Sequence, residues 1–351
     1  MSDILDCCSN STQDDNVKSF LSYIPSIYIT LGAFGIGLNA MVVFIKCKLF
    51  VKHYNNVTYI FMINLAIADV LALMVIAMGS AGMLLLPQYL FRKTLNKIMG
   101  YSLAVGWYVG SYFLCLITLS RFVAVTKSEE MHVYFSDRNK KLAMIGPWIG
   151  CLVGYCLILF YPYHVIRFFP EKATWDFDVA PSVFVLILSY ENAINNNLCV
   201  VFQVYFNART LLWLRRTQKN MAINLDQRRN RNREVKLFVQ CFISSCMYAA
   251  TAISFAFLNV KIPPFKEHEI IDMRSLIWYF SMAVAWIFHH STNSMIYFIL
   301  NRRLRQDVVA TFCRRATQVS VVGAASGKGS GENVPTVMAK KQINLTPIAA
   351  P

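Results

Sequence analysis

Four ionisable side chains lie inside long apolar stretches of the sequence, namely Asp69, Glu191, His289 and His290. Such residues are costly in a membrane, usually face the interior of a helix bundle, and indicate a functional site by default. Asp69 is either a hydrogen-bonded structural carboxylate or an ion site or activation hinge. Glu191 shares a helix face with Asn195, so it either lines a polar ligand cavity or bonds to neighbouring helices.

Catalysis and metal binding find little support in the other motifs. The chain has no phosphate-binding loop, no His-Glu-x-x-His helix and no Ser-His-Asp arrangement. His289 and His290 are adjacent, and adjacent helical residues point about 100° apart, so they do not easily share one ion. We therefore expect a protein that is not an enzyme and that holds no metal and no cofactor.

Seven long apolar segments must position these residues. Each has roughly 20 or more residues, enough for a helix to cross the ~30 Å hydrocarbon core of a bilayer at about 1.5 Å per residue. The segments are 21–45, 57–84, 98–121, 142–162, 179–212, 236–260 and 275–300. The sequence therefore predicts a seven-helix membrane bundle.

Small residues spaced four apart predict where these helices approach one another. Gly106 and Gly110 lie on the third segment, whose polar and small residues require protein neighbours on several sides. We expect this segment to be the central helix. Gly146, Gly150 and Gly154 predict a second packing groove, on the fourth segment.

Composition and charge give the orientation. Of 351 residues, 56% are apolar and 15% charged, which indicates a membrane protein in contact with lipid. The formal charge of +15 fits the positive-inside rule better than nucleic-acid binding. With the N-terminus outside, the inner loops and tail carry 24 of the 34 Lys and Arg residues and the outer parts 9. The N-terminus is therefore expected outside.

The expected fold class is an all-α membrane protein. Its parts are an extracellular tail (1–20), the bundle (21–300), a compact basic segment (301–315) and a disordered cytoplasmic tail (316–351) rich in Gly, Ala and Ser. Asn10 begins an Asn-Ser-Thr glycosylation sequon. Cys313, near the end of the basic segment, is a palmitoylation candidate.

Several short motifs follow one another in a specific order across residues 20–315. They are Gly37-Leu38-Asn39, Asn64-Leu65-Ala66-x-x-Asp69, Ser120-Arg121-Phe122, Trp148, Tyr205 and Asn293-Ser294-Met295-Ile296-Tyr297. In this order they resemble the rhodopsin-like G-protein-coupled receptor superfamily. By the same resemblance, the basic segment 301–315 is expected to form a short cytoplasmic amphipathic helix after the seventh span.

The chain departs from that family's pattern in several places. Ser120 stands where the family has an acidic residue, and Ser294 where it has a proline. The family's outer disulfide is impossible here, because the outer end of the third segment and residues 162–178 contain no cysteine. Divergence of this kind resembles the nematode serpentine chemoreceptors, in particular their class X.

The resemblance implies a chemosensory receptor that binds a small extracellular molecule and activates a heterotrimeric G protein. Its expected location is the plasma membrane, including that of a sensory cilium. The implied switch and G-protein-coupling residues are Arg121, Glu234, Tyr205, Asn293 and Tyr297. Glu234 either pairs with Arg121 in the inactive state or is a solvated residue that balances nearby arginines.

Two further groups of residues complete the expected site. Asp69, Asn39, His289 and His290 form an intramembrane polar site, in which a histidine pairs with Asp69 and takes the role of a sodium ion. The candidate ligand-pocket residues, which are equally ordinary packing residues, are Tyr101, Trp107, Tyr108, Ser111, Glu191, Asn195, Trp278 and Tyr279. The alternative function is a ligand-gated channel or transporter built on seven helices.

Overall fold

The computed structural model describes residues 2–48, 57–86, 93–162, 165–177, 183–220, 225–261 and 272–300, together with 305, 306, 308 and 309. The chain divides into two units, Met1–Arg305 and Gln306–Pro351. The elements of the first are α1 (Ser2–Lys48), α3 (Val57–Leu73), the π-helix η1 (Met74–Gly79), α4 (Ser80–Leu85), α5 (Lys93–Thr126), the 3₁₀ turn η3 (Ser128–Glu130), α6 (Met131–Tyr134), α7 (Asp137–Gly154), α8 (Leu157–Phe160), β1 (Ile166–Phe169), β2 (Thr174–Phe177), α9 (Val183–Asn220), α10 (Leu225–Lys261) and α11 (Met273–Leu300).

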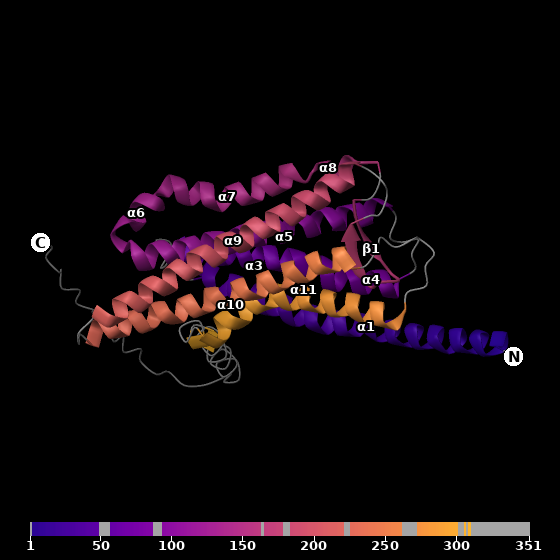
Figure 1. Ribbon diagram of the computed structural model, residues 1–351. Coiled ribbons are helices and arrows are strands. Elements are labelled where there is room, and N and C mark those ends of the chain that lie inside the picture. Colours follow the sequence, from indigo (N-terminus) through magenta and orange to yellow (C-terminus); the bar gives the residue numbers. More distant parts are fainter. Residues whose placement is uncertain are drawn as a thin grey trace, which may run out of the picture. The chain divides into compact units, whose positions relative to one another are not determined.

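Five stretches of the described helices are long and apolar enough to cross a membrane. They are Asp15–Cys47, Val57–Leu85, Thr94–Thr126, Asp137–Phe160 and Val235–Phe255. The helices α9 and α11 have 38 and 28 residues, but polar runs such as 191–197 and 289–294 lower their hydropathy. Mostly apolar helices that lie against one another make this unit a multi-pass membrane protein (Figure 1).

The helix α5 is the centre of the bundle, as the sequence predicted. It contacts α3, α7, α9 and α10. Gly106 and Gly110 face α3, where an added Cβ at Gly106 would lie 3.2 Å from the Cβ of Ala72. These two glycines therefore permit the close approach of α3 and α5.

The glycines of α7 do not form the packing groove that their spacing predicted. A Cβ added at Gly146, Gly150 or Gly154 would have no atom within 4 Å. The helix instead contacts its neighbours through other faces, and Trp148 donates a hydrogen bond of 2.9 Å to Asn64 Oδ1 on α3. The three glycines do share one face of α7, but that face points away from the bundle.

Replacing Gly106 by leucine is expected to destabilise the bundle, whereas Gly150→Leu is expected to be tolerated. A Cβ at Gly106 would lie 3.1 Å from the backbone nitrogen of Ala72 and 3.3 Å from the carbonyl oxygen of Ala68. Backbone atoms cannot move aside as a side chain does, and overpacking typically costs about 1–3 kcal/mol. Thermal unfolding of the two purified variants measures the difference. Equal midpoints would contradict this packing.

The first helix begins well before the expected boundary at residue 21. Residues 17–21 continue α1 because their apolar side chains pack against the bundle core. The Phe20 ring lies 5.4 Å from the Phe280 ring on α11, in an edge-on contact. The helix α1 starts at Ser2 and so includes residues expected in the N-terminal tail, whose extracellular location stays a prediction.

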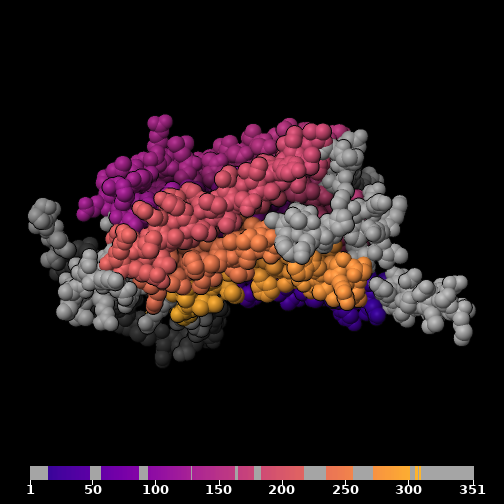
Figure 2. Space-filling model, viewed as in Figure 1, coloured from indigo at the N-terminus to yellow at the C-terminus, as the bar shows by residue number. Residues whose placement is uncertain are grey.

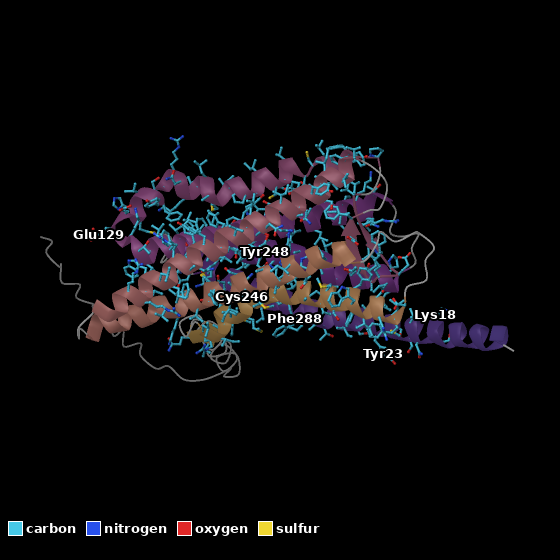
Figure 3. The ribbon with its side chains drawn as sticks, in the orientation of Figure 1. Lys18, Tyr23, Glu129, Cys246, Tyr248 and Phe288 are labelled. Atoms are coloured by element: carbon cyan, nitrogen blue, oxygen red, sulfur yellow. The ribbon has the colours of Figure 1, made fainter. Side chains whose placement is uncertain are left out.

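One β-hairpin departs from the all-α expectation. The strands β1 and β2 pair antiparallel, with Ile166 opposite Phe177 and Phe169 opposite Thr174. Their aromatic and branched side chains favour extended backbone. The hairpin and α4 lie at one end of the unit, and α6 lies at the other (Figure 1). Lys18 and Tyr23 are at the hairpin end, and Glu129 is at the opposite end (Figure 3).

Candidate functional site

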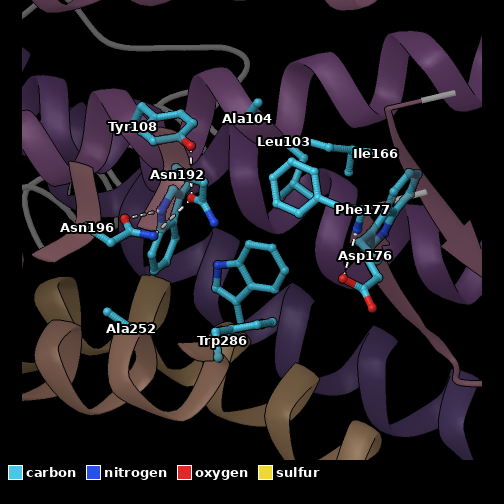
Figure 4. Close-up of a pocket in the computed structure, with 13 residues that line it drawn as sticks. Leu103, Ala104, Tyr108, Ile166, Asp176, Phe177, Asn192, Asn196, Ala252 and Trp286 are labelled. Atoms are coloured by element: carbon cyan, nitrogen blue, oxygen red, sulfur yellow. Dashed lines mark hydrogen bonds between the residues drawn. The ribbon is translucent and has the colours of Figure 1, made fainter. Parts of the chain in front are cut away.

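A cavity lies beneath the hairpin, between α5, α9, α10 and α11 (Figure 4). Its volume is about 80 Å³. Its lining consists of six aromatic residues (Trp107, Tyr108, Trp175, Phe177, Phe255 and Trp286), three polar residues (Asp176, Asn192 and Asn196) and four aliphatic residues (Leu103, Ala104, Ile166 and Ala252). Aromatic walls with a few fixed polar groups are typical of a site for a small organic molecule.

Hydrogen bonds fix the amide side chains on one wall of the cavity. Asn196 Oδ1 accepts from Trp107 Nε1 at 3.0 Å and from the Tyr248 hydroxyl at 3.0 Å. Asn192 Oδ1 accepts from the Tyr108 hydroxyl at 2.8 Å and from Asn196 Nδ2 at 2.9 Å. The wall therefore has one preferred arrangement before any ligand arrives.

The hairpin is held over the cavity without a disulfide. Trp175 Nε1 donates to Ser80 Oγ at 2.9 Å, and the Tyr28 hydroxyl donates to the carbonyl of Ala173 at 2.9 Å. The backbone nitrogen of Phe168 donates to Asn96 Oδ1 at 3.2 Å. These bonds connect the hairpin to α4, α1 and α5.

An ion pair within the hairpin joins its turn to β2 and brings Lys172 against α11. Lys172 Nζ lies 3.3 Å from Asp176 Oδ2, and it also lies 5.0 Å from the ring of Tyr279. Burial raises the pKa of the Asp176 carboxyl above its usual value, and the nearby Lys172 charge offsets part of that rise.

The pKa of Asp176 predicts a dependence of stability on pH. A carboxyl whose pKa is higher in the folded protein binds more protons folded than unfolded, so it stabilises the fold most below the usual carboxyl pKa of about 4. This stabilisation declines as pH rises through the raised pKa. Asp176→Asn is therefore expected to flatten the fall in unfolding midpoint across that interval. An unchanged pH profile in the variant would contradict the assignment.

Among the expected pocket residues, Trp107 and Tyr108 line the cavity. Glu191 lies beside it and accepts hydrogen bonds from Tyr108 at 3.3 Å and from Tyr155 at 2.9 Å. Asn195 accepts from the Tyr112 hydroxyl at 3.0 Å. The polar groups of Glu191 and Asn195 thus bond to α5 and α7–α8 neighbours, which is the structural alternative foreseen for Glu191.

The other four expected pocket residues lie outside the cavity lining. The Tyr101 hydroxyl bonds to the carbonyl of Leu152 on α7, and the buried Ser111 bonds to the carbonyl of Trp107 on its own helix. Trp278 is 43% exposed on the outside of α11. Tyr279 is buried and contacts Lys172 of the hairpin.

Asp69 lies in a fully buried polar network that joins α1, α3 and α11. His290 Nδ1 lies 2.7 Å from Asp69 Oδ1, and Asn293 Nδ2 donates to Asp69 Oδ2 at 3.2 Å. Asn39 Nδ2 donates to the carbonyl of His290 at 3.0 Å, and the Ser294 hydroxyl donates to Asn39 Oδ1 at 2.5 Å. The expected contact between a histidine and Asp69 is present, and His290 makes it.

His289 belongs to the cavity side of this network. Its ring lies 5.5 Å from Trp107 and 5.7 Å from Tyr248, in tilted or edge-on contacts. The Trp107 ring also lies 5.8 Å from the ring of His290. Trp107 therefore touches the cavity on one side and both histidines on the other, which connects the cavity physically to Asp69.

The expected switch residues lie toward the other end of the bundle. Arg121 and Tyr297 are buried, whereas Tyr205 is 56% exposed and points outward. Ser120, in the position of the superfamily's acidic residue, lies 3.0 Å from the hydroxyl of Thr58 on α3. Glu234 lies in α10, but its side chain is outside the described part of the structure.

Two modification candidates also fall outside the described residues. Asn10 belongs to α1, but its side chain is not described, and Cys313 lies beyond the last described residue. Most of the expected amphipathic helix at 301–315 is likewise outside, apart from four helical residues. Of these, Arg305 donates a hydrogen bond of 3.0 Å to the carbonyl of Phe298.

Long helices around a central α5, a roofed cavity and a buried Asp69 network are features of a seven-helix receptor. The model of the serpentine type 7TM GPCR chemoreceptor Srx family matches residues 29–301, and the chain belongs to this family. The family and the relatives below are receptors, which is consistent with a protein that is not an enzyme.

Similar proteins include receptors from mammals. Human C-C chemokine receptor type 4 is 29% identical over 129 residues, covering 36% of this chain and 33% of that receptor. Human cysteinyl leukotriene receptor 2 is 25% identical over 154 residues, covering 43% and 41%. Mouse C-C chemokine receptor 1-like protein 1 is 23% identical over 328 residues, covering 87% and 83%. The matches to the first two thus span well under half of each relative.

Proposed function

We propose that this protein is a chemosensory receptor of the plasma membrane that binds a small extracellular molecule and activates a heterotrimeric G protein. The proposal includes seven spans, with α9 and α11 as the fifth and seventh, and an N-terminus outside the cell. The excess of Lys and Arg in the loops on the other side supports this orientation. It also includes a short amphipathic helix after α11.

The observation that carries the proposal is the cavity and its contact with the buried polar network. The cavity lies at the hairpin end, which is the extracellular end in this orientation. Trp107 lines it and touches His289 and His290. A ligand that packs against Trp107 in one helix arrangement better than in another shifts the equilibrium between them.

The opposite end of the bundle is the proposed G-protein face. It contains Arg121 at the end of the motif Ser120-Arg121-Phe122, with Tyr297 buried in α11. Movement of α9 and α10 against α5 would change the exposure of Arg121, because α5 contacts both helices. Arg121 is therefore the residue whose loss should uncouple the receptor.

A nucleotide-exchange assay on the expressed receptor tests this proposal. Wild type and Arg121→Ala are compared against a panel of small water-soluble and volatile compounds, at matched surface levels. We expect compound-dependent exchange in the wild type and its loss in the variant. A compound-evoked current that needs no G protein would overturn the proposal in favour of a channel.

Glu234 is proposed to pair with Arg121 in the inactive state. Glu234→Ala is then expected to raise basal nucleotide exchange, because removal of the carboxylate frees the arginine to contact the G protein. Glu129→Ala, at an exposed acidic residue of the same end, is the matched control. Wild-type basal exchange in Glu234→Ala at normal surface expression would refute the pair.

A further inference from the structure

Two hydrogen-bond donors on the cavity wall have no partner among the described residues. Trp286 Nε1 is buried and makes no hydrogen bond. The amide nitrogen of Asn192 makes none either, although its carbonyl oxygen accepts two. In Figure 4 this amide nitrogen points toward the indole of Trp286. A buried donor without a partner is costly, so a bound group that accepts a hydrogen bond from Trp286 Nε1 is favoured, and the same group can also accept one from Asn192 Nδ2.

The orientation of the Asn192 amide follows from a chain of hydrogen bonds. The indole nitrogen of Trp107 can only donate, so the oxygen of Asn196 must face it. The Asn196 nitrogen then donates to Asn192, which turns the oxygen of Asn192 toward Asn196. The amino group of Asn192 is left facing the cavity. The bonds among Trp107, Asn196 and Asn192 thus make Asn192 present a donor, and not an acceptor, to a ligand.

The remaining lining restricts the charge and shape of that ligand. The described lining residues include one carboxylate, Asp176, and no Lys, Arg or His. Asp176 is already paired with Lys172, so the described lining offers no further positive charge to a ligand carboxylate. The rings of Trp107, Phe177 and Phe255 offer flat apolar walls on which an aromatic or unsaturated body packs well.

We propose that this cavity binds a small neutral carbonyl compound, whose oxygen accepts hydrogen bonds from both Trp286 Nε1 and Asn192 Nδ2. A carbonyl oxygen has two lone pairs and can satisfy both donors at once. The proposal rests on the proposed function, since it names the ligand class of the same cavity. The cavity volume of about 80 Å³ restricts the ligand to a compact molecule.

Nuclear magnetic resonance of the full-length receptor in lipid nanodiscs, with ¹⁵N-labelled tryptophan, tests the contact directly. The probes are acetone and isobutene, which are small enough for the cavity and have similar planar shapes but differ in the carbonyl oxygen. Trp286→Phe identifies the Trp286 indole signal, and the Trp278 signal, from an exposed position on the same helix, is the control. We expect acetone at millimolar concentration to shift the Trp286 signal downfield. We expect isobutene not to shift it, and the Trp278 signal to stay in place with both probes.

Affinity measurements complete the test. Acetone is expected to bind about tenfold more tightly than isobutene, because its oxygen adds two hydrogen bonds. Asn192→Leu should remove most of this preference. Equal binding of both probes, or an unmoved Trp286 signal, would overturn the carbonyl site.

The two proposals fail in different ways. If acetone shifts the Trp286 signal but no panel compound stimulates nucleotide exchange, the carbonyl site stands and the receptor function fails. If compounds without an acceptor atom stimulate exchange while acetone leaves the Trp286 signal unmoved, the receptor function stands and the carbonyl site is wrong.

Discussion

Replacing Trp175 by alanine is expected to release the hairpin from the helices and to abolish ligand-stimulated signalling. Trp175 is 2% exposed, packs against Phe168 across the hairpin, and donates its indole proton to Ser80 on α4. Removing a buried tryptophan side chain costs about 3–5 kcal/mol, and the lost hydrogen bond adds about 1 kcal/mol. The hydrogen bonds of the hairpin with Tyr28 and Asn96 would remain, but its buried contact with α4 would be lost.

The effect of Trp175→Ala is measured as the thermal unfolding midpoint and as nucleotide exchange at matched surface levels. Trp278→Ala is the control, because that indole is 43% exposed on the outer face of α11. We expect a large fall in midpoint and in ligand response for Trp175→Ala and little change for Trp278→Ala. A full ligand response in Trp175→Ala would show that the hairpin does not form the site.

The second large effect is expected at His290, whose ring occupies the space beside the Asp69 carboxylate. His290 Nδ1 lies 2.7 Å from Asp69 Oδ1, and both side chains are 1% exposed, so the ring occupies the position in which a cation would contact Asp69. Wild-type stability is therefore expected to be the same in sodium chloride and choline chloride of equal ionic strength. His290→Ala removes a hydrogen bond to a charged group, worth about 1.5–3 kcal/mol, and opens a space beside Asp69.

Sodium is then expected to raise the unfolding midpoint of His290→Ala, because an ion that binds only the folded state stabilises it. His289→Ala is the control, since its ring faces Trp107 and Tyr248. A sodium-dependent midpoint in the wild type would contradict the view that His290 replaces the ion. So would a response in His289→Ala equal to that of His290→Ala.

The helices and their central member were predictable because membrane spans are set by length and apolar composition. Gly106 and Gly110 predicted the close approach of another helix, and the structure shows that this helix is α3. The same spacing at Gly146, Gly150 and Gly154 predicted a contact that the structure lacks. Spacing identifies a helix face, but it does not identify which neighbour, if any, covers that face.

The face of α9 that lines the cavity is one residue away from the face that the sequence indicated. Glu191 and Asn195 share a face, but so do Asn192 and Asn196, and the second pair lines the cavity. The apolar side chains Ile194, Leu198 and Val201 are exposed on α9, which runs along the face shown in Figure 2. An apolar stripe of this kind predicts the lipid-facing side of a helix, and the opposite face of α9 contains Asn192 and Asn196.

The hairpin was also missed, although its sequence carries a strand pattern. Ile166-Arg167-Phe168-Phe169 and Thr174-Trp175-Asp176-Phe177 are rich in aromatic and branched residues and flank a turn that starts at Pro170. The absence of cysteines correctly excluded the disulfide. It could not show that Trp175 and Tyr28 hold the hairpin instead, because those contacts join segments far apart in sequence.

The proposed ligand site is tested most directly by filling the cavity without disturbing the rest of the bundle. Ala252 is buried in the lining on α10, whereas Ile253 beside it is 60% exposed. Ala252→Trp is expected to abolish ligand-stimulated nucleotide exchange and to preserve basal exchange and surface level, while Ile253→Trp responds normally. If nucleotide exchange in Ala252→Trp depends on ligand concentration as in the wild type, the ligand acts elsewhere and the cavity is not the ligand site.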